Sequence, residues 1–549
     1  MLAGCTPWPS DVAKRYRDLG YWQGITLTDL LARVIHRAPD RTALVHGGER
    51  ISYRALGETV DRLACGFLDS GIRALDRVVV QLPSIPEFVY TYFALARIGA
   101  IPVTALRAHR HTEVEHFLRA SGAVAYVIPD AIKGFDYRAM ARELAPKAPA
   151  LRAVFVVGEP ARGQHDMSTL LATRADAHLL SAVRVDPAEV TTMLLSGGTT
   201  SLSKLIPRTH EDYVLNARLC GAAAGFDENT VLMAILPLGH NYNLASPGML
   251  GAFYYGGTVV LAPSGDAADV FSLVERERVT AIAAVVPLIS GWLGSDAADR
   301  FDLSSLGVIQ NGGARLAPEL RSRLRARFGC TPQEIYGTAE GLINMTRLDD
   351  PDELLLESSG TPVCADDEIM VVDDDGREVA DGVPGELLTR GPYTIRGYYN
   401  APEKNREAFT EDGFYRMGDI VRRQGRHVFT EGRRKDLINR GGEKISCEEV
   451  ENLIYAHPKV KVATLVAMPD PVFGEKACAF VVTKPGETLS FDELTGFLRQ
   501  QKIASFKLPE RLEVVVELPL SPVGKILKRE LRERITEMLA HEARSRGAA

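Results

Sequence analysis

The stretch DRVVVQLPSIPEFVYTYFALARIGAIPVTA (residues 76–105) decides the fold class of this chain. It begins with a short apolar run that ends at Pro83, as a buried strand would. A segment with helical apolar spacing follows, and Gly99 stops it before a second short apolar run. This order of strand, helix and strand predicts a parallel sheet covered by helices.

The same alternation recurs on both sides of that stretch. The further segments that carry it are YRALGETVDRLACGFLDSGI, AVAYVIPD, TVLMAILPL, GGTVVLA, AIAAVVP and SLGVIQNGGA. The longest apolar run is IAAVVPLISGWL (residues 282–293). It is too short to span a membrane, and its length and Pro287 predict a buried strand followed by a turn. We therefore expect an α/β N-terminal lobe of several subdomains with parallel-type sheets.

The texture of the chain changes after about residue 360. Short strands and Asp-Gly turns in DEIMVVDDDGREVADGVPGELLTRGP predict a small antiparallel β-rich part. The polar segment TEGRRKDLINRGGEKIS (residues 430–446) is the expected interdomain joint, because few of its residues could be buried. The segments beyond it predict a small α+β lobe. A chain of 549 residues exceeds one core, so a ligand site between lobes is expected.

Composition narrows the class of protein. The net charge of −7 argues against a general nucleic-acid binder. The seven cysteines are far apart and form no Cys-x-x-Cys pair, which fits reduced thiols in a cytoplasmic protein. The N-terminal segment is too polar for a signal peptide, and no run of about 18 apolar residues predicts a membrane span.

The stretch LLSGGTTSLSKLIPRTH (residues 194–210) suggests a phosphate-binding loop. It is not a Walker loop, because no glycine directly precedes its lysine. Glycines let backbone N–H groups turn toward an anion, hydroxyls add donors, and a lysine adds a point charge. On its own such a stretch is most often a surface loop. The candidate residues are Ser196, Gly197, Gly198, Thr199, Thr200 and Lys204.

Three further residues have chemistry suited to a nucleotide site. Glu340 follows a strand-like segment, where a carboxylate can hold Mg²⁺ beside phosphates. Asp419, expected at the end of a strand, suits ribose hydroxyls. Lys525 follows a glycine turn, is expected to open a helix, and could reach into a distant cleft. Taken singly, the three are more often a loop Glu, a turn Asp and a solvated Lys.

The order and spacing of these motifs resemble the adenylate-forming superfamily over nearly the whole chain. The stretches that carry the resemblance are LLSGGTTSLSK, IYGTAEG, GELLTRGPYTIRGYY, GFYRMGD, GRRKDLINRGGEKIS and PVGKILKREL. WPSDVAKRYRDLGYW, PLGHNYNLASPG and YGTAEGLINMTRLDD look like the stand-alone aryl-acid–AMP ligases of siderophore pathways, and are most similar to the 2,3-dihydroxybenzoate–AMP ligases. Ala339 stands where the wider superfamily has Thr, as in the aryl-acid branch.

The resemblance implies ATP and Mg²⁺ and gives each nucleotide residue a role. Lys525 would bridge the acid carboxylate and the nucleotide, cationic at its ordinary pKa of ~10.4. Glu340 would hold Mg²⁺, and Asp419 with Arg433 would bind the ribose. The adenine slot would be lined by Gly313, Ala314, Tyr336 and Gly337. The loop at residues 196–204 would hold the β- and γ-phosphates, with Ser201 and Ser203 standing where the family usually has Gly and Pro.

The resemblance also implies an acid pocket. Asn241 would contact the carboxylate and the 2-hydroxyl, while Tyr242 and Ile343 would face the ring. His240 would shape the carboxylate site, although a lone histidine is more often structural. Ser246 could hydrogen-bond a 3-hydroxyl, which favours 2,3-dihydroxybenzoate, because an unpartnered buried hydroxyl costs about 1–3 kcal/mol. Asn243 departs from the branch's usual Pro, which leaves salicylate or another benzoate open.

The second step in this family transfers the acyl group to a thiol after the small lobe rotates. The implied division is an N-terminal domain (1–432), a hinge (433–436) with Lys435, and a mobile domain (437–549). Gly441, Gly442 and Lys444 would then face the thiol.

The expected acceptor is the phosphopantetheine of an aryl carrier protein. The alternative is an aryl-CoA ligase, whose acceptor is free coenzyme A. A silent nucleotide-binding protein is disfavoured because Lys525, Glu340 and Asp419 are present; the oligomeric state stays open.

Overall fold

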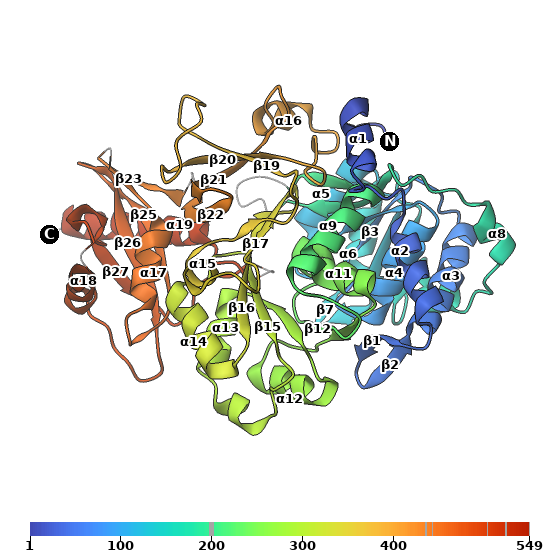
Figure 1. Cartoon of the computed structure of the whole chain (residues 1–549), viewed down its shortest axis with the longest axis horizontal. Helices are drawn as coiled ribbons and strands as arrows, with labels where there is room; N and C mark the ends of the chain where they lie inside the picture. Colours follow the sequence, from blue (N-terminus) through green and yellow to red (C-terminus); the bar gives the residue numbers. More distant parts are fainter. Residues whose placement is uncertain (197–202, 434–435, 442, 502, 522–523, 548–549) are drawn as a thin grey trace.

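The computed structural model describes residues 1–196, 203–433, 436–441, 443–501, 503–521 and 524–547. The fold is α/β, with a large N-terminal lobe beside a small C-terminal lobe (Figure 1). Across these residues no helix combines the length and apolar character that crossing a membrane requires. All seven cysteines are free thiols.

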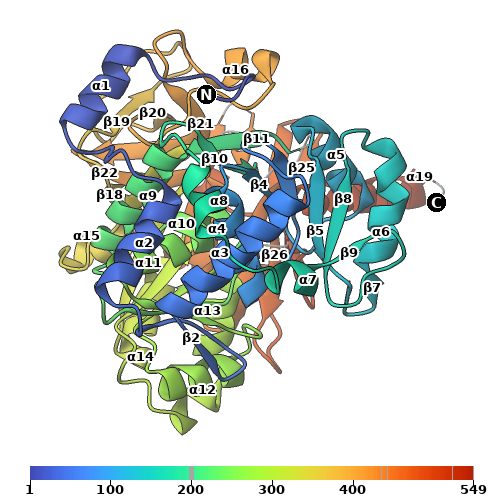
Figure 2. The ribbon, with the colours of Figure 1, turned by 90° about the vertical axis from the view of Figure 1, so that its right-hand side faces the viewer.

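A seven-stranded sheet contains the stretch 76–105 and confirms its predicted order. β3 (Arg77–Val80), α4 (Pro86–Arg97) and β4 (Ile101–Thr104) follow one another, and β3 pairs in parallel with β4 and β5. The other strands are β5 (Ala125–Pro129), β8 (Ala153–Val157), β9 (His165–Asp166), β10 (Val190–Leu195) and the antiparallel β11 (Leu205–Thr209). Helices α3 (Tyr53–Asp69) and α4 cover one face, and α5 (His111–Ser121) and α6 (Tyr137–Leu144) cover the other (Figure 2).

A nine-stranded sheet forms the second layer and confirms the later strand predictions. Its parallel centre is β12 (Val231–Ala234), β13 (Thr258–Leu261), β14 (Ala281–Ala284), β15 (Val308–Gly312), β16 (Thr331–Thr338) and β1 (Thr42–His46). Its antiparallel edges are β2 (Glu49–Ser52), β17 (Gly341–Met345) and β18 (Thr361–Pro362). One face packs on α2 (Leu27–Arg37), α9 (His210–Ala223), α10 (Asn241–Ala245) and α11 (Gly248–Tyr255), and the other on α12 (Ala267–Glu277), α13 (Val286–Leu293) and α14 (Pro318–Phe328).

The apolar run at residues 282–293 corrects one prediction. Its strand is β14, but the expected turn is the helix α13, with Ile289 and Trp292 buried. Pro287 lies in the first turn of that helix, where its missing N–H has no intrahelical partner to lose.

The antiparallel part and the small lobe form as predicted. The former is a four-stranded sheet of β19 (Glu368–Val372), β20 (Gly385–Arg390), β21 (Tyr415–Gln424) and β22 (His427–Arg433). The small lobe contains β23 (Ile438–Arg440), β24 (Glu443–Ile445), β25 (Val460–Asp470), β26 (Gly474–Thr483), β27 (Arg511–Val514), α17 (Cys447–Tyr455), α18 (Phe491–Gln500) and α19 (Lys528–Gly547). The remaining elements are α1 (Ser10–Asp18), α7 (Met167–Leu171), α8 (Ala177–Ala182), α15 (Asp352–Glu357), α16 (Pro402–Ala408), β6 (Ala131–Ile132) and β7 (Phe135–Asp136).

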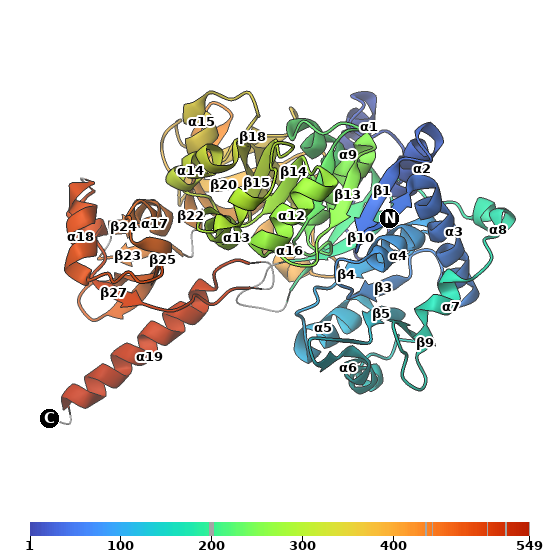
Figure 3. The same cartoon turned by 90° about the horizontal axis from the view of Figure 1, so that it is seen from below.

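In the segment 430–446 few of the described residues are buried, as expected: Ile438, Ile445 and Ser446. One expectation about the small lobe was wrong in detail. Lys525 does not open a helix: α19 begins at Lys528 and runs outward to the C-terminus (Figure 3). Residues 520 and 526 form an isolated bridge instead, which holds the lysine on a turn.

Candidate active site

Lys525 of the small lobe reaches the carboxyl end of β15 in the large lobe, next to Gly313. A Cβ added to Gly313, whose φ is +87°, would lie 3.1 Å from Lys525 Cε. On the lysine's own turn, Gly524 has φ +78°, and a Cβ there would lie 2.8 Å from Val285 Cγ2. Glycine at both positions therefore lets the lysine enter where ligands of parallel sheets usually bind.

The charges around Lys525 come from both lobes. Burial and the nearby Arg433 lower its pKa, Asp419 and Glu340 oppose them, and the net result is a pKa of about 8. The pKa is thus well below the expected ~10.4, yet the amine is still mostly protonated at neutral pH. The structure therefore brings Lys525, Arg433, Asp419 and Glu340 into one electrostatic site.

Asp419 is held from two sides. Tyr336 Oη donates to Asp419 Oδ2 at 2.7 Å, and Arg433 Nε lies 3.2 Å from Asp419 Oδ1. Asp419 and Arg433 are paired in register on β21 and β22, so Asp419 lies inside a strand and not at its end as expected. Burial and Asp419 raise the pKa of Tyr336, which keeps its hydroxyl a donor.

The surface beside Tyr336 is open backbone. Gly313, Ala314 and Gly337 are all exposed. The turn after β15 is fixed by Asn311 Nδ2, which donates to the Ala314 carbonyl at 2.7 Å. A flat group could therefore approach the Tyr336 side of the site without meeting large side chains.

Glu340 and Lys204 meet through Tyr398, a residue that the sequence interpretation missed. Tyr398 Oη donates to Glu340 Oε1 at 2.8 Å, and Lys204 Nζ lies 4.2 Å from the centre of the Tyr398 ring. Burial lowers the pKa of Lys204, and Glu340 acts in the opposite direction. Among the residues described, no cluster of three or more His, Cys, Asp or Glu could hold a metal ion.

The base of the predicted phosphate loop is closed by backbone contacts. Ser196 N donates to the Lys204 carbonyl at 3.0 Å, and Lys204 N donates to Ser196 Oγ at 2.8 Å. The loop residues between them, Gly197, Gly198, Thr199, Thr200 and Ser201, lie outside the described residues.

His240 begins the acid half of the site as the N-cap of α10. Its Nδ1 accepts from Tyr242 N at 3.4 Å, which leaves Nε2 to carry a proton. Burial and Lys525 lower the pKa of His240 to about 3, so the ring is neutral. Among the described residues Nε2 has no hydrogen-bond partner, so its N–H can donate to a carboxylate.

The other predicted acid residues are buried and close together. Asn241 Nδ2 donates to Ser246 Oγ at 3.2 Å. The Tyr242 ring lies against Gly312, where an added Cβ would be 2.8 Å from ring carbon Cε1. Ile343, 3% exposed, faces the backbone of Gly337, and so touches the nucleotide half.

Sequence reasoning missed the supports behind this pocket. Arg208 is fully buried and donates to Asp212 Oδ1 at 2.8 Å, to the Ala339 carbonyl at 2.9 Å and to the Tyr393 carbonyl at 3.0 Å. It thereby ties β11 to the turn that carries Glu340. The four-residue spacing of Arg208 and Asp212 was the available signal.

The residues predicted for the thiol step are only partly described. Lys435 and Gly442 lie outside the described residues, and Lys444 belongs to β24. Gly441 has φ +60°, and a Cβ there would lie 3.0 Å from Phe473 Cδ1 of the same lobe.

The two lobes also meet at a seam away from Lys525, which we define as Arg315, Thr430 and Glu448. Thr430 Oγ1 donates to Glu448 Oε1 at 2.8 Å, and Arg315 Nε lies 3.7 Å from the same oxygen. Burial raises the pKa of Glu448 to about 7, against the effect of Arg315.

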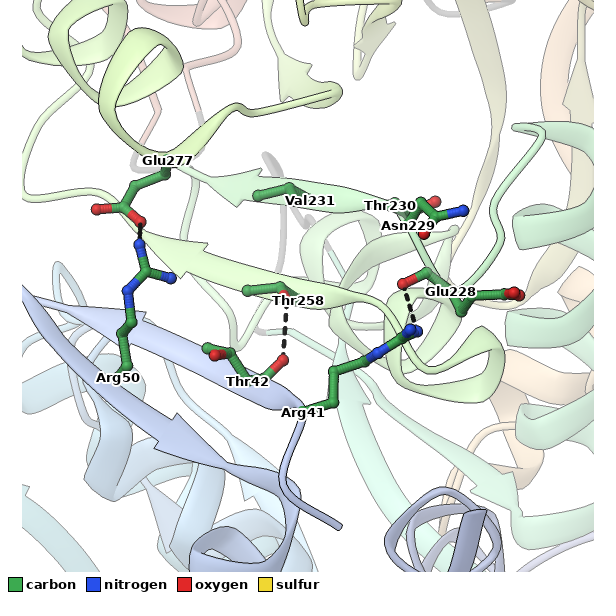
Figure 4. A pocket seen from close by; sticks show the side chains of 9 residues that line it. All are labelled: Arg41, Thr42, Arg50, Glu228, Asn229, Thr230, Val231, Thr258 and Glu277. Atoms are coloured by element: carbon green, nitrogen blue, oxygen red, sulfur yellow. Dashed lines mark hydrogen bonds and ion pairs between the residues drawn. The ribbon is translucent and has the colours of Figure 1, made fainter. Parts of the chain in front are cut away.

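A polar cavity of about 240 Å³ lies elsewhere in the large lobe (Figure 4). It lies at the amino ends of β1, β12 and β13, and its arginines are engaged: Arg41 donates to the Glu228 carbonyl at 2.7 Å, and Arg50 pairs with Glu277. Ligands of parallel sheets bind at the carboxyl ends, so this cavity is not the candidate site.

Comparison with known proteins places the chain among the AMP-binding enzymes. Residues 31–399 match the AMP-binding enzyme family, and residues 449–525 match the AMP-binding enzyme C-terminal domain. The chain is 48% identical to the 2,3-dihydroxybenzoate-AMP ligase of Bacillus subtilis, over 98% of this chain and 99% of the relative. It is 45% identical to a salicylyl-CoA synthase / salicylate adenylyltransferase of a Streptomyces species, over 96% and 97%. The apo structure of Mycobacterium smegmatis MbtA is 39% identical, with a TM-score of 0.74 and coverage of 97% and 99%.

Proposed function

Because the chain belongs to the AMP-binding enzyme family, in its aryl-acid–AMP ligase branch, we propose that it activates an aryl acid with ATP. The products are the acyl-adenylate and pyrophosphate. The observation that carries the proposal is the position of Lys525. It lies beside Gly313, in one site with Asp419, Arg433 and Glu340.

In the first half-reaction a carboxylate oxygen attacks the α-phosphorus of ATP, and the bond from that phosphorus to pyrophosphate breaks. Both reactants are anionic, so the site must supply positive charge and alignment. Lys525 has a pKa of about 8 and supplies that charge at neutral pH. His240 orients the carboxylate through its Nε2–H, and Asn241 contacts it from the start of α10.

The proposed roles of the nucleotide residues rest on the family resemblance, and the contacts of Tyr336, Asp419 and Arg433 support them. Asp419, braced by Arg433, binds the ribose hydroxyls, and Tyr336 stacks on the adenine. Gly313, Ala314 and Gly337 line the rest of the slot. The β- and γ-phosphates are bound by Ser196, Gly197, Gly198, Thr199, Thr200 and Lys204.

Glu340 has the right donor chemistry for Mg²⁺. Tyr398 engages Oε1, and Oε2 accepts no hydrogen bond from the described residues. Mg²⁺ usually takes one or two carboxylates together with phosphate oxygens, so a single glutamate fits. When bound, the ion would neutralise phosphate charge.

We propose 2,3-dihydroxybenzoate as the acid, with Tyr242 and Ile343 facing the ring and Ser246 facing the 3-position. Salicylate is the second candidate, favoured by the 45% identical relative whose name contains salicylate.

In the second half-reaction a thiol sulfur attacks the acyl carbon, and the bond from that carbon to AMP breaks. We propose that the acceptor is the phosphopantetheine of an aryl carrier protein in siderophore biosynthesis; free coenzyme A is the alternative, which the same relative's name favours. For this step residues 437–549 rotate on residues 1–432 about the hinge 433–436 at Lys435, and bring Gly441, Gly442 and Lys444 to the thiol.

Acid-dependent ATP–pyrophosphate exchange tests the proposal, with 2,3-dihydroxybenzoate, salicylate, benzoate, anthranilate and a medium-chain fatty acid. We expect 2,3-dihydroxybenzoate to lead. A lead for salicylate keeps the branch but removes Ser246 as the determinant, and a lead for the fatty acid contradicts an aryl acid. Loading of a carrier protein against thioester formation with coenzyme A then identifies the acceptor.

A further inference from the structure

One face of α9 forms the wall behind Ser246. Tyr213, Asn216 and Cys220 are spaced three and four residues apart, so they share that face, and all three are fully buried. Tyr213 Oη donates to Asn241 Oδ1 at 2.8 Å. The wall is therefore a hydrogen-bonded part of the acid pocket.

The orientation of the Asn216 amide is fixed by its neighbours. Its Nδ2 donates to the Ala245 carbonyl at 2.7 Å and to Ser246 Oγ at 3.1 Å. A carbonyl only accepts, so the nitrogen must point this way. Asn216 Oδ1 has no partner among the described residues, but a flipped amide would aim that oxygen at two other oxygens.

Both acceptor sites of the Ser246 hydroxyl are thereby occupied. One accepts from Asn216 at 3.1 Å, and the other accepts from Asn241 Nδ2 at 3.2 Å. The Asn241 amide is oriented in turn by Tyr213, which donates to its oxygen. A hydroxyl has two lone pairs and one proton, so only the proton of Ser246 is left for a ligand.

The protein itself offers that proton a poor acceptor. Burial raises the pKa of the Cys220 thiol, and a hydrogen bond from Ser246 acts in the opposite direction. Because thiol sulfur is a weak acceptor, a ligand oxygen would compete well for the proton.

We propose that Asn216 is a positioning residue that makes Ser246 a donor only, so that this site selects acids with an acceptor oxygen at ring carbon 3. The inference rests on the proposed function. A 3-hydroxyl accepts from Ser246 and gives its own proton to the neighbouring 2-oxygen. A 3-amino group cannot replace it, because its lone pair is delocalised into the ring and its N–H groups meet the serine proton.

The test compares kcat/KM in ATP–pyrophosphate exchange for 2,3-dihydroxybenzoate, salicylate and 3-amino-2-hydroxybenzoate. The native enzyme should prefer the 3-hydroxy acid to the 3-amino acid at least about tenfold, since a mismatched buried donor is strongly rejected. Asn216→Leu frees a lone pair of Ser246, so this ratio should fall toward one. Salicylate has no 3-substituent and reports general damage to the pocket.

Ser246→Ala and the double variant separate positioning from direct contact. If Asn216 acts through Ser246, the double variant should have the same ratio as Ser246→Ala alone. Asn216→Asp keeps the size of the side chain and offers an acceptor to Ser246, so it should shift the ratio in the same direction should Asn216→Leu fold poorly.

Two results would overturn the inference. If Asn216→Leu lowers kcat/KM for all three acids by one factor, Asn216 only packs the helix. If Asn216→Leu changes the ratio by the same factor in the Ser246→Ala background as in the native enzyme, Asn216 contacts the acid directly. Exchange with none of the three acids in the native enzyme would instead sink the proposed function, and the inference with it.

Discussion

The nucleotide half of the site and its acid half differ in where their side chains come from. Tyr336, Asp419 and Arg433 stand on separate strands around exposed backbone, and Lys525 arrives from the other lobe. The acid half is made by buried side chains of α9, α10 and β17, all within the large lobe. The acid pocket is therefore formed without the small lobe, whereas the nucleotide site is complete only when the lobes meet.

Lys525→Ala should break the nucleotide half and spare the acid half. Removing a cation aimed at developing charge typically costs about 10²–10³-fold in rate, so acyl-adenylate formation should fall by that factor. The Kd for the acid, measured by calorimetry, should change little. Lys461→Ala, an exposed lysine of β25, is the control. Equal loss of thioester formation from supplied adenylate would contradict the assignment.

The pH dependence of kcat/KM should report the titration of Lys525. Its pKa is lowered to about 8, so the ammonium is present below pH 8 and is lost as pH rises through that value. On the alkaline limb kcat/KM should fall about tenfold per pH unit, whereas an ordinary lysine would hold to ~10.4. In Lys525→Arg the side chain stays protonated, so the fall in kcat/KM near pH 8 should disappear. If the fall stays at the same pH, another group causes it.

Gly313→Ala should disturb the contact between the halves more mildly. The added Cβ lies 3.1 Å from Lys525 Cε on a backbone with φ +87°, so we expect adenylate formation to fall about tenfold. Gly329→Ala is matched, because its φ is +68° but nothing lies within 4 Å of an added Cβ. Equal losses in activity would show that backbone strain, and not the lysine, is responsible.

The smallest expected effects are changes in KM, and each variant should change KM for one substrate only. Tyr336→Phe removes one hydrogen bond to Asp419, which Arg433 still holds, so KM for ATP should rise about threefold with KM for the acid unchanged. Ser246→Ala should raise KM for the acid and leave KM for ATP unchanged. A shift of both KM values in either variant would mean that the halves are coupled, with Ile343 and Gly337 as the contact between them.

The same contrast explains what the sequence could predict. Glu340, Asp419 and Lys525 each lie in a short contiguous motif, which can be recognised without knowing any distant contact. The strands and helices of residues 76–105 follow from the periodicity of apolar residues. Asn216 was missed because its contact with Ser246 spans 30 residues, and the contact of Arg208 with Ala339 spans 131. The start of α19 was placed too early because the bridge between residues 520 and 526 is a pairing that no apolar period reports.

The seam of Arg315, Thr430 and Glu448 links lobe movement to protons. With a pKa of about 7, the Glu448 carboxyl is about half protonated at neutral pH while the lobes touch. Separation would expose it and return its pKa toward ~4.3, so at neutral pH each opening would release about half a proton on average. Acid therefore favours the closed contact, fully below ~4.3, and this advantage is lost as pH rises through about 7. In weakly buffered solution, an indicator dye could follow each opening of the enzyme with no label on the protein.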